Sequence, residues 1–170
     1  VCAVLAVIYI QWRDKSYSEA KVLKTVKETG LENASVIPLG NYILQYSKDG
    51  MSCMNSGGEV RWNQTFEMQS PMIHTCEDAV AVGDYNGHLI YVADSQGPLG
   101  EIDTNLPIRS FCVASQGVVA AILDDTNVTW INLYDKSGNS LANIKTTMKD
   151  SGYPIKVSLS PNGQLLCVSL

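Results

Sequence analysis

The sequence has few charged residues, and it lacks the basic clusters that nucleic-acid-binding proteins use. Asp, Glu, Lys and Arg make up 17% of the 170 residues, and the formal net charge is −5. Binding to phosphates normally depends on clustered Lys and Arg. The densest group of lysines, Lys15, Lys21, Lys24 and Lys27, is interleaved with acidic residues. We therefore expect a solvated charged face there, and no binding to nucleic acid.

The sequence also lacks the short motifs that mark common catalytic and metal sites, such as G-x-S-x-G, a phosphate-binding Gly loop or C-x-x-C. His74 and His88 have no patterned Ser, Asp or Cys partner, which favours a structural role. The acidic turns at residues 84–87, 124–127 and 135–139 do not have the spacing of a calcium loop. Asp and Asn suit tight turns for local reasons. We predict no metal ion and no catalytic residue in this sequence.

The cysteines show no pairing pattern. Cys76, Cys112 and Leu159 each lie five residues after a proline. A repeated position that accepts both Cys and Leu favours a small apolar core site. A disulfide between two of the cysteines that follow the N-terminal run stays open, since disulfides persist outside the cytoplasm.

No hydrophobic run in the sequence is long enough to cross a bilayer by itself. The first residue is Val1, and residues 1–10 are apolar, whereas a span takes about 20 residues. Trp12 and Arg13 follow where interfacial anchors belong. A buried first strand or the core of a signal peptide is the alternative. We expect residues 1–12 to be the C-terminal part of a transmembrane helix that keeps the rest of the protein on one side of the membrane.

From Gly40 onward the sequence consists of short apolar segments separated by turn signals. Asn-Gly, Asp-Gly and Ser-Gly suit tight turns, whereas Val, Ile, Tyr and Trp favour strands. No long segment with a helical period competes with them, so the fold class is all-β. Strands are expected in NYILQYS, MSCMN, EVRWNQTF, AVAVGD, HLIYVAD, VVAAILD, VTWINLYD and QLLCVSL.

These segments form a repeat. Three units open with a proline, a strand, a turn and a second strand; the prolines are Pro71, Pro107 and Pro154. A glycine marks the second hairpin of successive units at intervals of 40 and 41 residues, at Gly57, Gly97 and Gly138. A period near 40 residues with four short strands is typical of a β-propeller blade.

One four-stranded blade cannot cover both of its own faces, so blades stack around an axis, usually 4–8 of them. We count about two whole blades and parts of two more. Residues 31–170 are therefore expected to be an incomplete β-propeller domain, a fragment in which QLLCVSL is the second strand of the last blade. The repeated prolines and glycines, with Trp62, are expected to serve blade packing.

Two segments resemble known propeller repeats. NSGGEVRWNQT is similar to the D-x-x-G-x-x-x-W blade ending of quinoprotein-like propellers, in which the Trp, here Trp62, packs on the next blade. SPNGQLLCVS resembles a strand pair of WD40-like propellers. The apolar N-terminal run, combined with YILQYSKDGMSCMNSGGEVRWNQTFEMQSP, AVGDYNGHLIYVADSQGPLGEIDTNLPI and SGYPIKVSLSPNG, is similar to an uncharacterised bacterial family, a domain of unknown function found chiefly in clostridia-like Gram-positives. Its members have a single-pass membrane span and an extracytoplasmic propeller.

The resemblance implies that residues 13–30 are a juxtamembrane segment in which residues 17–29 form a ring-closing strand, although their own pattern fits a strand or a helix. Quinoprotein dehydrogenases use adjacent cysteines and a Trp beneath the quinone. This sequence has no adjacent Cys pair, and Trp130 falls inside a strand, so we expect no cofactor.

The leading hypothesis is a non-catalytic binding or scaffolding propeller, anchored in the cell membrane and facing outward. Its partner would be an envelope or cell-surface protein or ligand. The alternative is a quinoprotein-like or glycosidase-like enzyme whose active-site residues lie in blades outside this sequence.

Overall fold

The computed structural model describes residues 33–126, 128–147 and 152–170, and six single residues nearer the N-terminus: Val4, Tyr9, Arg13, Lys21, Val22 and Thr25. Apart from those six, the expected transmembrane segment (1–12) and juxtamembrane segment (13–30) lie outside the described residues. In the described part of the chain, no helix is both long enough and apolar enough to cross a membrane.

The described residues form three four-stranded antiparallel sheets and a two-stranded hairpin. The first sheet contains β1 (Ser35–Leu39), β2 (Tyr42–Tyr46), β3 (Gly50–Met54) and β4 (Val60–Thr65). The second sheet contains β5 (Pro71–Cys76), β6 (Ala79–Asp84), β7 (Leu89–Asp94) and β8 (Pro98–Asp103). The third sheet contains β9 (Ile108–Val113), β10 (Val119–Asp125), β11 (Val128–Tyr134) and β12 (Ser140–Thr146). The C-terminal hairpin contains β13 (Lys156–Leu159) and β14 (Leu166–Ser169).

The all-β class and the four-stranded repeat are confirmed, but the count of about two whole blades is wrong, because three sheets are complete. The additional strands are β1, β8 and β12. The side chains of β12 are exposed from Ser140 to Lys145, so this strand has no alternation of apolar and polar residues to reveal it. The chain turns from β1 into β2 at Gly40, whose φ is +56°, and the strand before that turn is partly exposed and contains Pro38.

The strands of the second sheet bury side chains on both faces. Along β6, Val80 and Val82 belong to the core shared with the first sheet, whereas Ala79 and Ala81 belong to the core shared with the third sheet. All four are fully buried. Because successive side chains of a strand point to opposite faces, a continuous apolar segment is what a strand between two neighbouring sheets requires.

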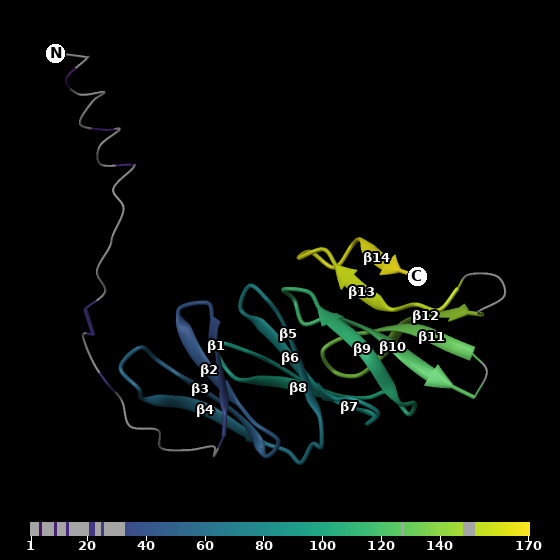
Figure 1. Cartoon of the computed structure of the whole chain (residues 1–170), viewed down its shortest axis with the longest axis horizontal. Coiled ribbons are helices and arrows are strands. Elements are labelled where there is room, and N and C mark those ends of the chain that lie inside the picture. The colour runs from purple at the N-terminus through teal and green to yellow at the C-terminus, as the bar shows by residue number, and fades with distance from the viewer. Residues whose placement is uncertain are drawn as a thin grey trace.

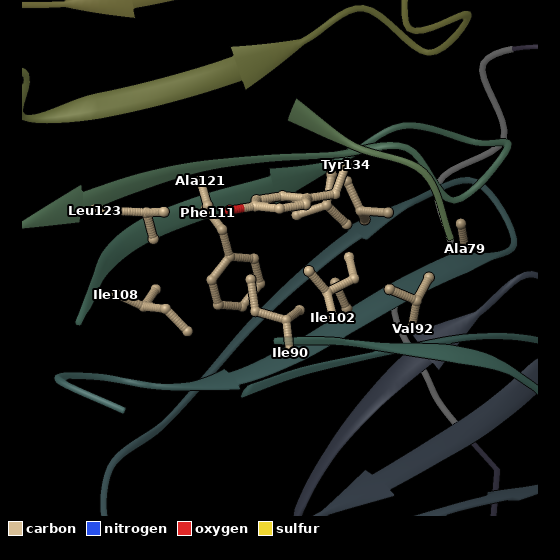
Figure 2. Close-up of a cluster of buried hydrophobic side chains, with 12 residues drawn as sticks. Ala79, Ile90, Val92, Ile102, Ile108, Phe111, Ala121, Leu123 and Tyr134 are labelled. Atoms are coloured by element: carbon tan, nitrogen blue, oxygen red, sulfur yellow. The ribbon is translucent and has the colours of Figure 1, made fainter. Parts of the chain in front are cut away.

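The third sheet follows the same rule. Along β10, Ala121 and Leu123 pack toward the second sheet, whereas Ala120 and Ile122 pack toward the C-terminal hairpin. Figure 2 shows the core between the second and third sheets, in which Phe111 lies among the aliphatic side chains. Complete burial of one such aliphatic side chain contributes about 1.5–3 kcal/mol, so these interfaces hold the sheets together.

The sheets follow one another in space in chain order (Figure 1). The first strands of the second sheet, the third sheet and the hairpin lie side by side, since β9 contacts both β5 and β13. The hairpin packs on the third sheet through β13. Four-stranded sheets that stack face to face in chain order and share a buried core with each neighbour are arranged as propeller blades are.

Candidate functional site

The connections between successive sheets lie at one end of the strands, which we call the inter-sheet end. A chain that runs through four antiparallel strands enters and leaves the sheet at the same end, and the turn between the second and third strands lies there too. In the described chain this end comprises residues 47–49, 66–70, 85–88, 104–107, 126, 147 and 152–155. Loops carried on a rigid sheet are common places for binding sites.

A hydrogen-bonded network at the inter-sheet end joins the second sheet, the third sheet and the chain leading into the hairpin. Arg109 donates from Nε to Asp124 Oδ2 at 2.5 Å, and from Nη1 to the Tyr85 hydroxyl at 2.8 Å and to Asn86 Oδ1 at 2.7 Å. The hydroxyl of Tyr153 donates to Asp124 Oδ1 at 2.8 Å. Three segments distant in sequence are therefore fixed relative to one another. We call these five residues the aromatic platform.

Charges in the aromatic platform are paired. The hydrogen bond to Asp124 is the main cause that raises the pKa of the Arg109 guanidinium above its ordinary value. Burial, followed by the hydrogen bond to Asp124, raises the pKa of the Tyr153 hydroxyl, so this group stays neutral and donates. The Arg109 and Asp124 side chains are 34% and 23% exposed, so water screens the pair and its contribution to stability is on the order of 1 kcal/mol.

Two tyrosine rings of the aromatic platform remain accessible. Tyr85 is 42% exposed and Tyr153 is 40% exposed. The Arg109 guanidinium lies 5.4 Å from the centre of the Tyr85 ring, within cation–π range. Because their hydroxyls are held, the rings offer contact area with little loss of side-chain freedom. Tyr and Arg are also among the residues enriched at binding hot spots. The geometry suits recognition of a partner.

A small pocket adjoins the aromatic platform on the side of the first sheet. Its cavity volume is about 140 Å³, and it is lined by Glu67, Met68, Asp84, Gly87, His88, Leu89 and Tyr91. A second cavity, of about 210 Å³, lies between the outer strands of the first and second sheets and is lined by Met51, Gln64, Tyr91, Val92, Pro98, Gly100 and Glu101.

The three glycines singled out in the sequence occupy the turn between the third and fourth strands of each sheet, opposite the inter-sheet end. Gly138 has a φ of +84°, and an added Cβ would lie 2.9 Å from the carbonyl oxygen of Glu101. Gly97 faces open space, and the nearest atom to a Cβ at Gly57 would be Asn55 Oδ1 at 3.0 Å. Among the three, only Gly138 combines a positive φ with a close approach to the preceding sheet.

The other predicted packing residues lie at the starts of sheets and in an interface. The prolines open successive units: Pro71 is the first residue of β5, Pro107 directly precedes β9, and Pro154 lies two residues before β13. Trp62, on β4, packs against the core cluster that contains Leu44 of the first sheet and Val82 of the second. Its indole N–H is buried without an acceptor among the described residues.

The histidines take separate positions. His74 lies on β5, where its Nδ1 accepts the backbone N–H of Val113 at 3.2 Å, which bridges the first strands of two sheets. Burial, with Lys156 adding to the effect, lowers its pKa. His88, at the inter-sheet end, lies 3.1 Å from the carboxylate of Asp103.

The described cysteines and acidic turns form no common metal site. The described cysteines, Cys53, Cys76, Cys112 and Cys167, are all free thiols. In the described ranges, no three His, Cys, Asp or Glu side chains gather closely enough to hold a metal ion. Asp135 is used locally, since it accepts the backbone N–H groups of Ser137 and Asn139 in its own turn. Asp84 and Asp124, by contrast, accept hydrogen bonds from outside their own turns. Hydrogen bonding from Asn139 is the main cause of the lowered pKa of Asp135.

The aromatic platform was not predicted from the sequence. Arg109 is the only charged residue of β9, and that contrast with its apolar neighbours is the one signal that could have revealed it. Tyr85 precedes an Asn-Gly turn and Tyr153 follows a Gly, so both resemble ordinary loop residues. Their convergence on Arg109 depends on how successive sheets pack.

Comparison with known proteins identifies the fold. The family described as a family of unknown function (DUF5711) matches residues 13–170. No curated protein matches the chain by sequence. Among solved structures, Hsv2 of Kluyveromyces lactis with loop 6CD replaced by a Gly-Ser linker is 16% identical, with a TM-score of 0.59 over 86% of this chain and 49% of that one. Another structure of Kluyveromyces lactis Hsv2 is 14% identical, with a TM-score of 0.56 over 79% and 44%.

A bacterial structure gives a similar match. BamB from Moraxella catarrhalis is 14% identical, with a TM-score of 0.50 over 77% of this chain and 41% of that one. These structural neighbours are WD40-like or related β-propeller proteins, and at such identities the likeness concerns the fold alone. The chain spans about half the length of the solved structures that it matches.

Proposed function

The chain belongs to the family of unknown function DUF5711, and we propose that it is a non-catalytic binding or scaffolding module that recognises a partner at the inter-sheet end. The observation that carries this proposal is the aromatic platform. The rings of Tyr85 and Tyr153 are accessible, yet their hydroxyls are held by one Arg–Asp pair that ties three segments together. Binding by such a surface needs little ordering of side chains, which reduces its entropic cost.

Selection from a random-peptide phage library on the immobilised protein tests this role. We expect a consensus peptide whose affinity falls at least about ten-fold in the Tyr85→Ala, Tyr153→Ala double variant, because truncated aromatic anchors commonly cost that much. Leu141→Ala is the matched control, since Leu141 is an exposed apolar side chain, 56% accessible, on the distant strand β12. Enrichment of no sequence, or equal affinity for the double variant, would overturn the proposal.

We further propose that the module is held at the outer face of the cell membrane, with an envelope or cell-surface protein or ligand as its partner. The support is the apolar run of residues 1–10, closed by Trp12 and Arg13, where interfacial anchors belong. Sequencing the coding DNA upstream of Val1 tests it: a span requires about 20 apolar residues, so on the order of ten more should precede Val1. A polar or acidic upstream segment would rule the anchor out.

A further inference from the structure

The pocket beside the aromatic platform is lined by both apolar and acidic side chains. Met68, Leu89 and the ring of Tyr91 form an apolar wall, while Glu67 and Asp84 bring two carboxylates. Its cavity of about 140 Å³ is the size of a side chain and far below the several hundred Å³ typical of sites for drug-sized ligands.

Asp84, Tyr91 and Met68, three of the residues that line the pocket, are held in place by contacts within the protein. Asp84 accepts the backbone N–H groups of Gln69 at 3.1 Å and Ser70 at 2.6 Å, which holds the chain between the first and second sheets against the β6–β7 turn. Phe66 stacks on Tyr91 with 5.1 Å between the ring centres. Met68 is 5% exposed. This part of the pocket is therefore formed before a ligand binds.

An apolar wall beside carboxylates matches the side chain of lysine or arginine. Their methylene stems pack along apolar surface while the charged group stays at a polar edge, and hydrogen bonds between a cationic donor and a carboxylate are stronger than neutral ones. The formal net charge of −5 also favours approach of a basic partner. An acidic side chain would be repelled by Glu67 and Asp84.

The pocket and the aromatic platform share one turn. Asp84, Gly87 and His88 line the pocket, while Tyr85 and Asn86, within the same turn, take part in the Arg109 network. The backbone of the turn is held to the third sheet, because Asn86 N–H donates to the Ile108 carbonyl at 2.9 Å. A peptide lying across the turn can thus reach both surfaces.

We propose that this pocket receives a lysine or arginine side chain of an extended peptide segment whose adjoining residues lie on Tyr85. The inference rests on the proposed binding role and specifies the chemistry of the partner. Glu67 and Asp84 select the cation, and the wall formed by Met68, Leu89 and Tyr91 contacts the methylene stem.

Titration of the isotope-labelled protein with capped tripeptides, Gly-Lys-Gly and Gly-Arg-Gly, tests the proposal by NMR. The control peptide carries norleucine, which keeps the methylene chain but lacks the cationic group. We expect the backbone amide signals of Gly87, His88 and Leu89 to shift with a basic peptide, at a dissociation constant at least about five-fold lower than with norleucine. Equal affinities for the basic and norleucine peptides would overturn the proposal.

A charge variant gives an independent readout. Glu67→Gln should weaken binding of the basic tripeptide about three- to ten-fold and leave norleucine binding unchanged. The matched control is Glu59→Gln, which removes the same charge in the β3–β4 turn at the opposite end of the sheets. The phage selection can also separate the two proposals. A consensus peptide that contains no basic residue and binds Glu67→Gln normally, yet depends on Tyr85 and Tyr153, would refute the lysine or arginine pocket and leave the binding role of the aromatic platform supported.

Discussion

Replacement of Gly100 by alanine should separate the second and third sheets. Gly100 lies on β8, and an added Cβ would stand 2.1 Å from the carbonyl oxygen of Lys136, in the β11–β12 turn. Real Cβ atoms essentially never come closer than 3.0 Å to another heavy atom, so the two sheets have to move apart there by at least 3.0 − 2.1 = 0.9 Å. The obstacle is backbone and cannot rotate away.

The expected cost is large because the core beneath this contact is closely packed. Overpacking of a well-packed interior typically costs about 1–3 kcal/mol, occasionally more, and we expect about 3 kcal/mol for Gly100→Ala. With a urea m-value on the order of 2 kcal/mol/M, the unfolding midpoint should fall by about 1.5 M. Tryptophan fluorescence can follow this, since Trp62 and Trp130 report on the first and third sheets.

Gly97→Ala is the matched control, because it makes the same chemical change three residues earlier. Its Cβ would meet no atom within 4 Å, and Gly97 is not among the residues with positive φ. Alanine there should be neutral or stabilise by up to about 1 kcal/mol through the unfolded chain. Equal urea midpoints for the two variants would refute the close approach of β8 and the β11–β12 turn.

Three further outcomes are expected. Gly138→Ala should lower the urea midpoint by an amount corresponding to about 1–3 kcal/mol, since it adds a Cβ at a φ of +84° and 2.9 Å from the Glu101 carbonyl; a midpoint equal to that of Gly97→Ala would contradict this. Burial raises the pKa of the Cys112 thiol to about 11, so at pH 8 its alkylation, followed by mass spectrometry, should be about 100-fold slower in the folded than in the urea-unfolded chain. The stability that the neutral Cys112 thiol contributes is full below about pH 9 and is lost as the pH rises toward 11. Comparable alkylation rates for the folded and unfolded chains would contradict the burial of Cys112. Burial lowers the pKa of His74 below 6.5, so the contribution of neutral His74 to stability is full above pH 6.5 and declines as the pH falls. The urea midpoint should therefore drop more between pH 7.5 and 5 in the natural protein than in His74→Gln. Equal drops in the two proteins would contradict the burial of this imidazole.

Local chemistry made part of the fold predictable. AVAVGD and VVAAILD are continuous apolar segments between turn signals, and they became β6 and β10, the strands buried on both faces. By contrast, β12 has exposed side chains on both faces over most of its length, so hydrophobic periodicity carries no signal for it.

The candidate site was not predictable in the same way. The contact between Arg109 and Tyr85 joins residues 24 positions apart in neighbouring sheets, and it depends on which turns meet when one sheet packs on the next. The sequence marks Gly138 as a turn residue, but the close approach at Gly100 comes from Lys136 of the following sheet. Neither the turn chemistry nor the repeat period contains that information.

Successive side chains of β6 point in turn to two different interfaces, and this limits where codons can be inserted into or deleted from the gene. Deleting a single codon within β6 would shift the later residues by one, so that side chains suited to one neighbouring sheet would point toward the other. Insertions and deletions in this family should therefore fall in the turns, or add and remove whole four-stranded units. Related genes that differ in length by multiples of about 40 codons would keep every interface intact.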